Sequence, residues 1–368
     1  MTEVVKTHEQ LTAEVADLPL PVDDVATPTF VVLEDSMLHN LRVTASAAGG
    51  IDRLMPHVKT HRAPWICEWM MDQGVSSFKA ATPLEVKMCL EAGAKHVLWA
   101  YPTANLANIR KVLTAAQEHS SSRIQVLYDS EEGLQAWISE LKASPSQNIF
   151  LVLDLDPGMG RTGAVIEGNA IELAQSGADS GIFDGFHLYD GHIQDIDREV
   201  RIKKNQENVD RVLPLLKRAE SAGLCNNLIA SGSWSFDLWP ADVAQYVSPG
   251  SFIYSSAQHT KELPHLGWKM AAYVLASVVS SRAGSATLDA GSKSISPDMI
   301  LSQRFFGPGS IAAMKEEHAV IETDNLKVGS KVPLIPRHTC TTAYLFPEAL
   351  VLRSNGTWER KEQLGNRR

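Results

Sequence analysis

One lysine stands out by its surroundings. Lys59 lies in the segment PHVKTHR, between His57 and His61. A lysine amine that burial or neighbouring positive groups keep partly neutral can form a Schiff base with an aldehyde. The alternative is a solvated lysine in a loop, which is the more common situation for a single lysine. The segment therefore makes Lys59 a candidate for the lysine that forms a Schiff base.

A second pair of residues could bind a metal ion. His338 and Cys340 lie at positions i and i+2 in PLIPRHTCTTAY, which would place both side chains on one face of an extended strand. Imidazole and thiolate together suit zinc. Two protein ligands leave positions for water or substrate, as in a catalytic site. The alternative is an ordinary histidine and a buried cysteine in a strand.

Two short loops have the composition of an anion site. They contain Ser231, Gly232 and Ser233 in SGSW, and Gly250 and Ser251 in SPGS. Glycine lets backbone N–H groups approach an anion and the hydroxyls add donors, so the loops suit a phosphate. Such loops are more often simple turns. Their place after the last of the expected parallel strands favours phosphate, because barrels commonly bind phosphate there.

The elements that position these residues alternate in type along the chain. Apolar, β-rich runs are separated by segments with helical periodicity, such as 83–92, which predicts a parallel sheet buried on both faces. Eight runs predict a closed (β/α)8 barrel over residues 25–256, with a doubly wound open sheet as the alternative. The runs are Thr27–Glu34, Arg53–Thr60, Ser76–Thr82, His96–Tyr101, Arg123–Asp129, Ile149–Asp156, Phe183–Gly191 and Asn227–Ser233.

After Ser256 the pattern changes. Short β-rich runs such as YVLASVVSS and KVPLIPRH follow one another without long helices between them. This predicts a smaller antiparallel β domain formed by residues 257–368, to which residues 1–24 could add. The expected metal ligands lie in this domain, and the expected cofactor residues lie in the barrel.

Composition narrows the partners and the location. The formal net charge of −9 is spread along 368 residues, which disfavours nucleic acid as a partner. Four widely separated cysteines without CxxC spacing indicate a reducing compartment. The N-terminal residues do not resemble a signal peptide, and the longest apolar run, 270–279, is too short to span a membrane. We therefore expect a cytoplasmic protein with a small-molecule substrate.

Taken together and in order, the motifs resemble the D-threonine aldolase and D-serine dehydratase family. This is the metal-dependent branch of the alanine-racemase-like (fold type III) pyridoxal-phosphate enzymes. The resemblance runs from about residue 27 to residue 352. It rests on PHVKTHR, GMGRTG, YDGHIQ, SGSWSF, SPGSFIY, LDAGSKSIS, EEH and PRHTCTTA. It implies that Lys59 holds pyridoxal phosphate, and that Arg161 and Tyr189 contact the cofactor.

The resemblance also implies a reaction. A divalent metal, zinc or manganese, held by His338 and Cys340 would bind the 3-hydroxyl of a D-3-hydroxy-amino acid in a homodimeric lyase. His-x-Cys is typical of the dehydratases, whereas the patterns in YDGHIQ and LDAGSKS are typical of the aldolases. We favour retro-aldol cleavage to glycine, or another 2-amino acid, and an aldehyde, with a metal-bound water or a histidine such as His192 as the base. The alternatives are a dehydratase, a racemase or non-catalytic pyridoxal-phosphate protein, and a metal-free barrel that binds a phosphorylated metabolite.

Overall fold

The computed structural model describes residues 15, 17–21, 24–324 and 326–368. Contacts divide the chain into two compact units. The barrel unit contains Ala45–Lys59, Pro64–Gly250 and Arg368. The β unit contains the described residues up to Thr44, together with Thr60–Ala63 and Ser251–Arg367. These units differ from the expected domain ranges mainly at residues 25–44 and 60–63.

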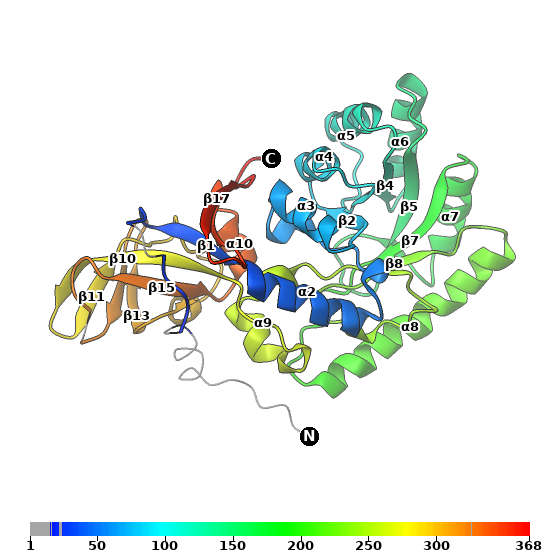
Figure 1. The fold of residues 1–368 in the computed structure, drawn as a ribbon. Helices are drawn as coiled ribbons and strands as arrows, with labels where there is room; N and C mark the ends of the chain where they lie inside the picture. Colours follow the sequence, from blue (N-terminus) through cyan, green and yellow to red (C-terminus); the bar gives the residue numbers. More distant parts are fainter. Residues whose placement is uncertain (1–14, 16, 22–23, 325) are drawn as a thin grey trace. The chain divides into compact units, whose positions relative to one another are not determined.

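A parallel sheet forms the centre of the barrel unit (Figure 1). Five of the expected runs, from Ser76–Thr82 to Phe183–Gly191, are strands here, and Ile149–Asp156 matches at both ends. The expected run at Asn227–Ser233 is a shorter strand, and β9 was not expected. The sheet order is β2 (Ser77–Ala80), β3 (His96–Trp99), β4 (Arg123–Tyr128), β5 (Ile149–Asp156), β7 (Phe183–Leu188), β8 (Leu228–Ala230) and β9 (Tyr246–Val247), with β6 (Ala164–Val165) paired to β5.

A segment without regular strand structure joins the two edges of this sheet. Leu54 forms a parallel bridge with Val247 of β9, and His57 forms one with Lys79 of β2. The expected strand Arg53–Thr60 is therefore wrong as a continuous strand. Pro56 has no N–H to donate and only accepts a hydrogen bond, from the backbone N of Lys79 at 2.9 Å. The segment nevertheless continues the hydrogen bonding from β9 round to β2, which supports the barrel architecture.

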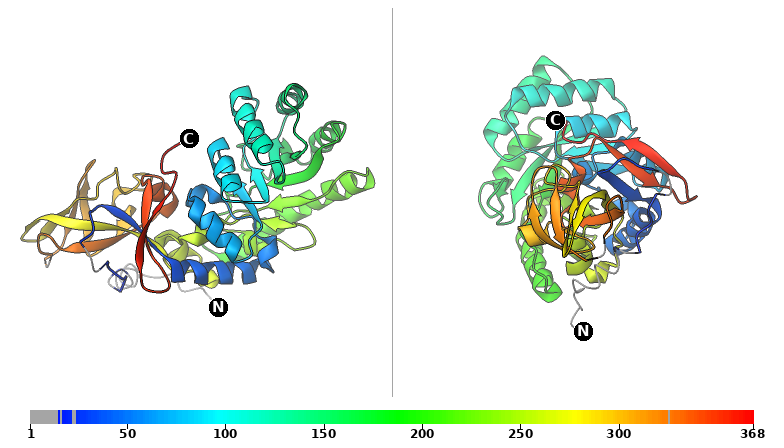
Figure 2. Two further views of the ribbon diagram at one scale, coloured as in Figure 1. Left: turned by 45° about the horizontal axis from the view of Figure 1, so that its top comes forward. Right: turned by 90° about the vertical axis from the view of Figure 1, so that its left-hand side faces the viewer.

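Helices lie along the outside of the parallel sheet (Figures 1 and 2). Polar residues begin several of them: Thr82 accepts a hydrogen bond from Glu85 N, and Ser130 accepts one from Gly133 N. Inside the sheet, one apolar residue from each of β3, β4, β5 and β8 forms a cluster with Met55. The helices are α3 (Pro64–Asp72), α4 (Pro83–Glu91), α5 (Leu106–Glu118), α6 (Glu131–Ala143), α7 (Ala170–Ala178) and α8 (Arg198–Ser221).

The β unit is built on a largely antiparallel sheet, as expected. The expected first barrel strand, Thr27–Glu34, belongs to this sheet instead, because β1 pairs with β10 and β16. Its run TFVVL is buried throughout. An apolar run of this kind indicates a strand inside a sheet, but it does not indicate which sheet contains the strand. The strands are β1 (Thr29–Leu33), β10 (Ala272–Arg282), β11 (Ser285–Leu288), β12 (Phe305–Phe306), β13 (Ser310–Met314), β14 (Ala319–Glu322), β15 (Lys331–Pro336), β16 (Glu348–Leu352) and β17 (Trp358–Glu362).

The core of the β unit includes part of the N-terminal segment. Val15 packs in an apolar cluster with Val31, Tyr273 and Ile335. The hydroxyl of Tyr273 donates a hydrogen bond to the carbonyl of Pro19. Most of residues 1–24, which could add to this domain, lie outside the described residues. Among the described residues, no helix is long and apolar enough to cross a membrane.

Candidate active site

Three positive side chains surround one aromatic ring in the barrel unit. Lys59 lies in a 3-10 turn, Val58–Thr60, and its Nζ is 5.6 Å from the centroid of the Tyr189 ring. The guanidinium carbon of Arg161 is 4.9 Å from the same centroid, and Nζ of Lys79 is 5.5 Å from it. The structure therefore brings together three of the residues named for the cofactor, Lys59, Arg161 and Tyr189, and adds Lys79 to them.

The close packing of the Tyr189 ring explains why glycine stands at position 191 of YDGHIQ and at position 232 of SGSW. A Cβ atom added at Gly191 would overlap the ring of Tyr189, and one added at Gly232 would press against its edge. YDGHIQ and SGSW therefore contribute backbone that the ring can approach closely. Any larger residue at either position would displace the ring that the three cations surround.

Asp190, the residue after Tyr189, fixes the neighbouring loop. It is buried and accepts hydrogen bonds from Gly232 N at 3.1 Å, Ser235 Oγ at 2.7 Å and Trp239 Nε1 at 3.0 Å. Burial raises the pKa of this carboxyl, and the hydrogen bonds from Ser235 and Trp239 oppose the rise. Asp190 was not among the residues predicted for the site, although it lies within the motif YDGHIQ.

The two predicted phosphate loops are joined to each other. Ser248 N donates to Ser231 Oγ at 3.3 Å, and Gly250 N donates to Ser233 Oγ at 3.1 Å. Ser231 has a φ of 74°, a left-handed conformation that a serine adopts only under local constraint. The N–H groups of Gly232 and Gly250 thus have protein partners. The phosphate site at these loops stays a prediction.

A buried histidine–aspartate pair lies at the ends of β5 and β7. His187 Nδ1 is 2.6 Å from Asp154 Oδ1, and Asp154 Oδ2 accepts from Thr162 Oγ1 at 2.8 Å. Burial and the nearby Lys79 lower the pKa of His187 to about 4, even though Asp154 opposes the change. His187 is therefore neutral at physiological pH.

Two further histidines flank Lys59 and are also neutral. Burial, followed by the charges of Lys59 and Lys79, holds the pKa of His57 well below its usual value. Burial lowers the pKa of His61 to about 3. The two histidines of PHVKTHR therefore add no positive charge beside Lys59.

His192, the proposed base, lies in the exposed loop after β7. The imidazole is close enough to Asp190 to oppose the rise that burial causes in the pKa of that carboxyl. Its exposure keeps it accessible to a ligand. The catalytic role remains a prediction.

In the β unit, His338 and Cys340 lie at the start of a short helix. β15 ends at Pro336, His338 is the N-cap residue, and α10 covers Thr339–Ala343. The expectation that both residues lie on an extended strand is therefore wrong. The two side chains nevertheless meet, because a hydrogen bond joins His338 to Cys340.

An aspartate completes this cluster. His338 Nδ1 is 2.5 Å from Asp298 Oδ2. Burial alone would lower the pKa of His338, but the hydrogen bond to Cys340 and the charges of Cys340 and Asp298 outweigh it, and raise the pKa to about 9. Asp298 was missed by the sequence analysis, because it precedes His338 by 40 residues with no motif linking the two.

Cys340 has two more polar neighbours in the β unit. Its Sγ lies 3.4 Å from Oγ1 of Thr60, the residue that follows Lys59 in the sequence, and 3.9 Å from Oγ of Ser251. Within the described part of the chain, no three His, Cys, Asp or Glu side chains are arranged to hold a metal ion. The metal site at His338 and Cys340 stays a prediction that rests on two donors.

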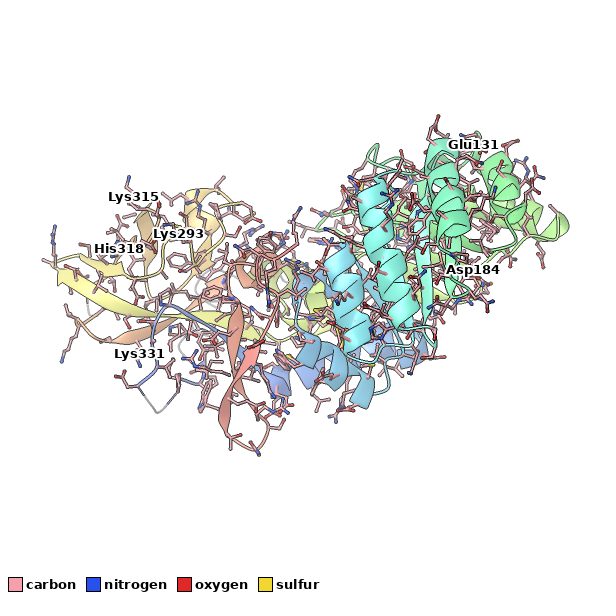
Figure 3. The ribbon with its side chains drawn as sticks, turned by 90° about the horizontal axis from the view of Figure 1, so that it is seen from above. Glu131, Asp184, Lys293, Lys315, His318 and Lys331 are labelled. Carbon is pink, nitrogen blue, oxygen red and sulfur yellow. The ribbon has the colours of Figure 1, made fainter. Side chains whose placement is uncertain are left out.

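Two other motifs of the β unit are joined by backbone. Gly291 of LDAGSKS has no room for a Cβ atom against the Glu316 carbonyl, and Lys293 N donates to that carbonyl at 3.0 Å. Lys293 also pairs with Glu316 and Glu317 at the surface. Figure 3 labels Lys293 with His318 at this sheet, and His318 is exposed. The hydrogen bond from Lys293 N thus joins the two motifs.

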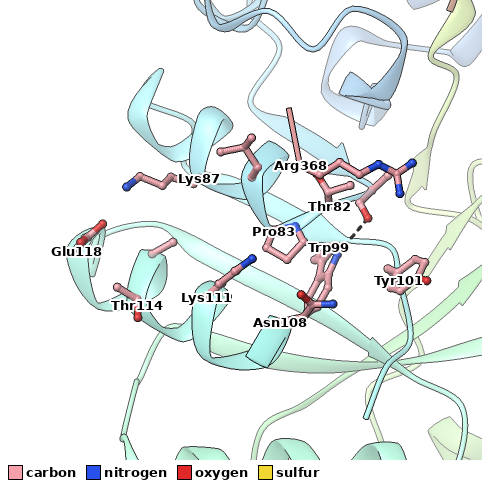
Figure 4. A pocket seen from close by; sticks show the side chains of 13 residues that line it. Thr82, Pro83, Lys87, Trp99, Tyr101, Asn108, Lys111, Thr114, Glu118 and Arg368 are labelled. Carbon is pink, nitrogen blue, oxygen red and sulfur yellow. Dashed lines mark hydrogen bonds between the residues drawn. The ribbon is translucent and has the colours of Figure 1, made fainter. Parts of the chain in front are cut away.

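A cavity of about 660 Å³ lies elsewhere in the barrel unit, between α4 and α5 (Figure 4). Thr82, Trp99 and Lys111 are among its lining residues, and Trp99 Nε1 donates to the Ala81 carbonyl at 3.3 Å. None of Lys59, Lys79, Arg161 or Tyr189 lines it. We therefore assign this cavity no part in the chemistry.

Comparison with known proteins agrees with this arrangement. Residues 32–258 match the family model of the alanine racemase N-terminal domain, and residues 271–352 match a putative serine dehydratase domain. Since the first match covers more than half of the chain, the chain belongs to the family defined by the alanine racemase N-terminal domain. The expected alanine-racemase-like fold is thereby confirmed.

The individual relatives include D-threonine aldolases and a D-serine dehydratase. The chain is 24% identical to a D-threonine aldolase of Arthrobacter sp over 90% of both proteins. It is also 24% identical to a D-serine dehydratase of Dictyostelium discoideum, over 91% of this chain and 95% of the relative. The crystal structure of D-threonine aldolase from Filomicrobium marinum superposes with a TM-score of 0.86 at 23% identity, covering 95% of this chain and 98% of the other. The expected resemblance to the D-threonine aldolase and D-serine dehydratase family is confirmed.

Proposed function

We propose that this chain is a pyridoxal-phosphate-dependent lyase that acts on a D-3-hydroxy-amino acid. The observation that supports the proposal best is the cluster of Lys59, Lys79 and Arg161 around Tyr189 at the ends of the barrel strands. Active sites of barrels lie at these ends. The similarity to an aldolase and a dehydratase, both named for D-amino acids, agrees with it.

The residues present fit the cofactor. Its aldehyde needs an accessible amine, which Lys59 offers, and its anionic groups need positive partners, which Arg161 and the buried Lys79 offer. The loops at 231–233 and 248–251 would hold its phosphate. When bound, pyridoxal phosphate supplies an electron sink for the electrons of a breaking bond at the substrate α-carbon.

The chain's own residues would orient groups and move protons. Lys59 would hold the cofactor and exchange protons with the α-carbon. The neutral His187 donates from Nδ1 to the Asp154 carboxylate, so its Nε2 can accept a hydrogen bond without bringing charge into the site. Asp190 keeps the loop at Gly232 in place. The exposed His192 would take the proton of the substrate hydroxyl.

We propose that His338 and Cys340 hold a divalent metal. Imidazole and sulfur are donors that zinc accepts, and Asp298 would orient the imidazole through Nδ1. Two protein ligands leave positions for water or a substrate oxygen. We propose the 3-hydroxyl of the substrate as that oxygen, because a bound metal makes a hydroxyl more acidic.

We favour carbon–carbon cleavage over dehydration. The DAGxKS and YxGxxQ patterns, typical of the aldolases, are built into the structure through Gly291 and Gly191. Cys340 favours the dehydratase. Both reactions would use the same residues, and they differ in which substrate bond breaks. The proposed cytoplasmic homodimer is compatible with either reaction.

The reaction can be tested with a panel of substrates. Purified protein supplied with pyridoxal phosphate and manganese or zinc is incubated with D-threonine, D-phenylserine, D-serine and D-3-hydroxyaspartate. Aldehyde and ammonia are measured separately. We expect aldehyde and an equal amount of glycine without ammonia. Formation of ammonia and a 2-oxo acid would show a dehydratase instead of an aldolase. If no D-substrate gave either an aldehyde or ammonia, the lyase proposal would be contradicted.

A further inference from the structure

Lys79 is the least expected residue of the candidate active site. It lies on β2, inside the run SSFKAA, where the neighbouring residues Phe78 and Ala80 are fully buried. Its side chain is 2% exposed, and its Nζ has no hydrogen-bond partner among the described residues. A buried ammonium without a partner is costly in a folded protein. Such a group indicates that a ligand supplies the missing partner.

The surroundings of Lys79 define the charge of that ligand. The pKa of Lys79 is lowered to about 7, mainly by burial and next by the positive charge of Lys59. Arg161 also lowers the pKa, whereas Asp154 and Asp190 raise it. The ring of Tyr189 also faces Lys79, and so do His57 and His187, whose own pKa values Lys79 lowers. Because burial, which disfavours the charged amine, is the largest of these causes, an anionic ligand beside Nζ would stabilise the ammonium group.

We propose that Lys79 is a cofactor-binding residue whose ammonium group pairs with the ring phenolate oxygen of pyridoxal phosphate. This inference rests on the proposed function. Nζ of Lys79 and Nζ of Lys59 lie 5.5 and 5.6 Å from the same ring centroid, that of Tyr189. In pyridoxal phosphate the phenolate oxygen is next to the aldehyde carbon that Lys59 would hold. It would therefore be the cofactor anion nearest to Lys79, while the phosphate is expected at the serine loops.

The proposal predicts opposite effects with and without the cofactor. Lys79→Met removes the charge and nearly keeps the length of the side chain. In the protein without cofactor, no hydrogen bond of Nζ to a described residue is lost, so stability against urea should stay the same or rise. With cofactor, the dissociation constant should increase by about tenfold or more, because a hydrogen bond to a charged group is lost.

Absorbance gives a second readout that a merely structural role would not change. A cation beside the phenolate favours loss of a proton from the bound cofactor. The pH midpoint of the cofactor's absorbance should therefore rise by about one unit in Lys79→Met. Lys79→Arg keeps the charge and serves as the matched control, with a midpoint close to that of the original protein. Lys79→Gln repeats the measurement if the methionine variant does not fold.

The experiment combines these titrations with borohydride reduction and peptide mapping. An unchanged dissociation constant and midpoint in Lys79→Met, with cofactor attached at Lys59, would overturn the role of Lys79 and leave the proposed function intact. A variant that loses affinity for a D-amino acid alone would assign Lys79 to the substrate carboxylate and also overturn it. Cofactor attached to Lys79, or no cofactor absorbance in the original protein, would remove the proposed cofactor site and this inference together.

Discussion

The barrel unit and the β unit each contain a histidine whose Nδ1 lies next to an aspartate. The distance is 2.6 Å between His187 and Asp154, and 2.5 Å between His338 and Asp298. Yet the pKa of His187 is lowered to about 4, whereas that of His338 is raised to about 9. At neutral pH the first imidazole is uncharged and the second is protonated.

The difference comes from what surrounds each pair. His187 is buried and lies near Lys79 and Arg161. Burial and these two positive charges both disfavour protonation of its imidazole. His338 is partly exposed and has the sulfur of Cys340 on its other side. A neighbouring carboxylate thus does not decide the charge of a histidine. The barrel cluster is suited to bind anions, and the β-unit cluster is suited to bind a cation.

The largest expected effect comes from removing the proposed cofactor lysine. Lys59→Ala should lower turnover by about a thousandfold or more, because the attachment and the proton-transferring amine are both lost. Steady-state kinetics with the D-substrate that the panel identifies will measure it. Lys95→Ala removes an exposed lysine of the same unit and should leave turnover unchanged. Equal losses in both variants would show that the barrel cluster has no special role.

Asp190 tests whether the barrel cluster depends on its buried carboxylate. Asp190→Ala leaves three donors without their partner and should lower the free energy of unfolding by about 3 kcal/mol. Asp195→Ala is the matched control, since Asp195 pairs with Lys204 near the surface and should cost less than about 1 kcal/mol. Urea denaturation distinguishes the two. Similar values for both variants would contradict the anchoring role of Asp190.

The β-unit cluster can be tested by metal binding. Cys340→Ala should weaken zinc or manganese binding by about a hundredfold, because one of two proposed protein ligands is lost. Isothermal titration of the metal-free protein measures the affinity. Cys225→Ala, in the barrel unit, removes a partly buried thiol with no proposed role and should bind metal as before. Unchanged binding in Cys340→Ala would exclude this cysteine as a ligand.

The smallest effects concern the two histidines themselves. In the metal-free protein, NMR titration should show His338 losing its proton near pH 9, and His187 remaining neutral above about pH 5. Since the pKa of His338 is raised on folding, its contribution to stability is fully present below about pH 6.5 and is lost as the pH rises through about 9. Asp298→Asn should lower that pKa by about one unit. A His338 that titrates near pH 6.5 would remove the contrast between the units.

The sequence predicted the strands of the parallel sheet better than it predicted β1 and the segment at HTC. IFLVLDLD is apolar enough to place Ile149–Asp156 correctly, because a strand buried on both faces needs such a run. FVVL has the same pattern, yet β1 joins the other sheet, since pairing depends on contacts with β10 and β16, more than 200 residues away in the chain. HTC looked like a strand because β15 precedes it, but the backbone turns into α10 at Thr339.

Part of the candidate site lies in local motifs that the sequence could identify. Lys59, Arg161 and Tyr189 lie near one another in the structure, and their contacts with a cofactor remain a prediction. Asp298 and Lys79 were missed for different reasons. Asp298 meets His338 only through the fold. Lys79 gave a signal that was not used, because a lysine inside an apolar strand run is already a candidate for a buried charge.

The most direct test of the proposed function is the attachment of the cofactor. Purified protein is incubated with pyridoxal phosphate, reduced with borohydride, digested and mapped by mass spectrometry. We expect the pyridoxyl group on Lys59, with an absorbance band before reduction that the Lys59→Ala variant lacks. A protein that shows no such band, or that carries the group on Lys79 or Lys293, would contradict the assignment of Lys59 as the cofactor lysine.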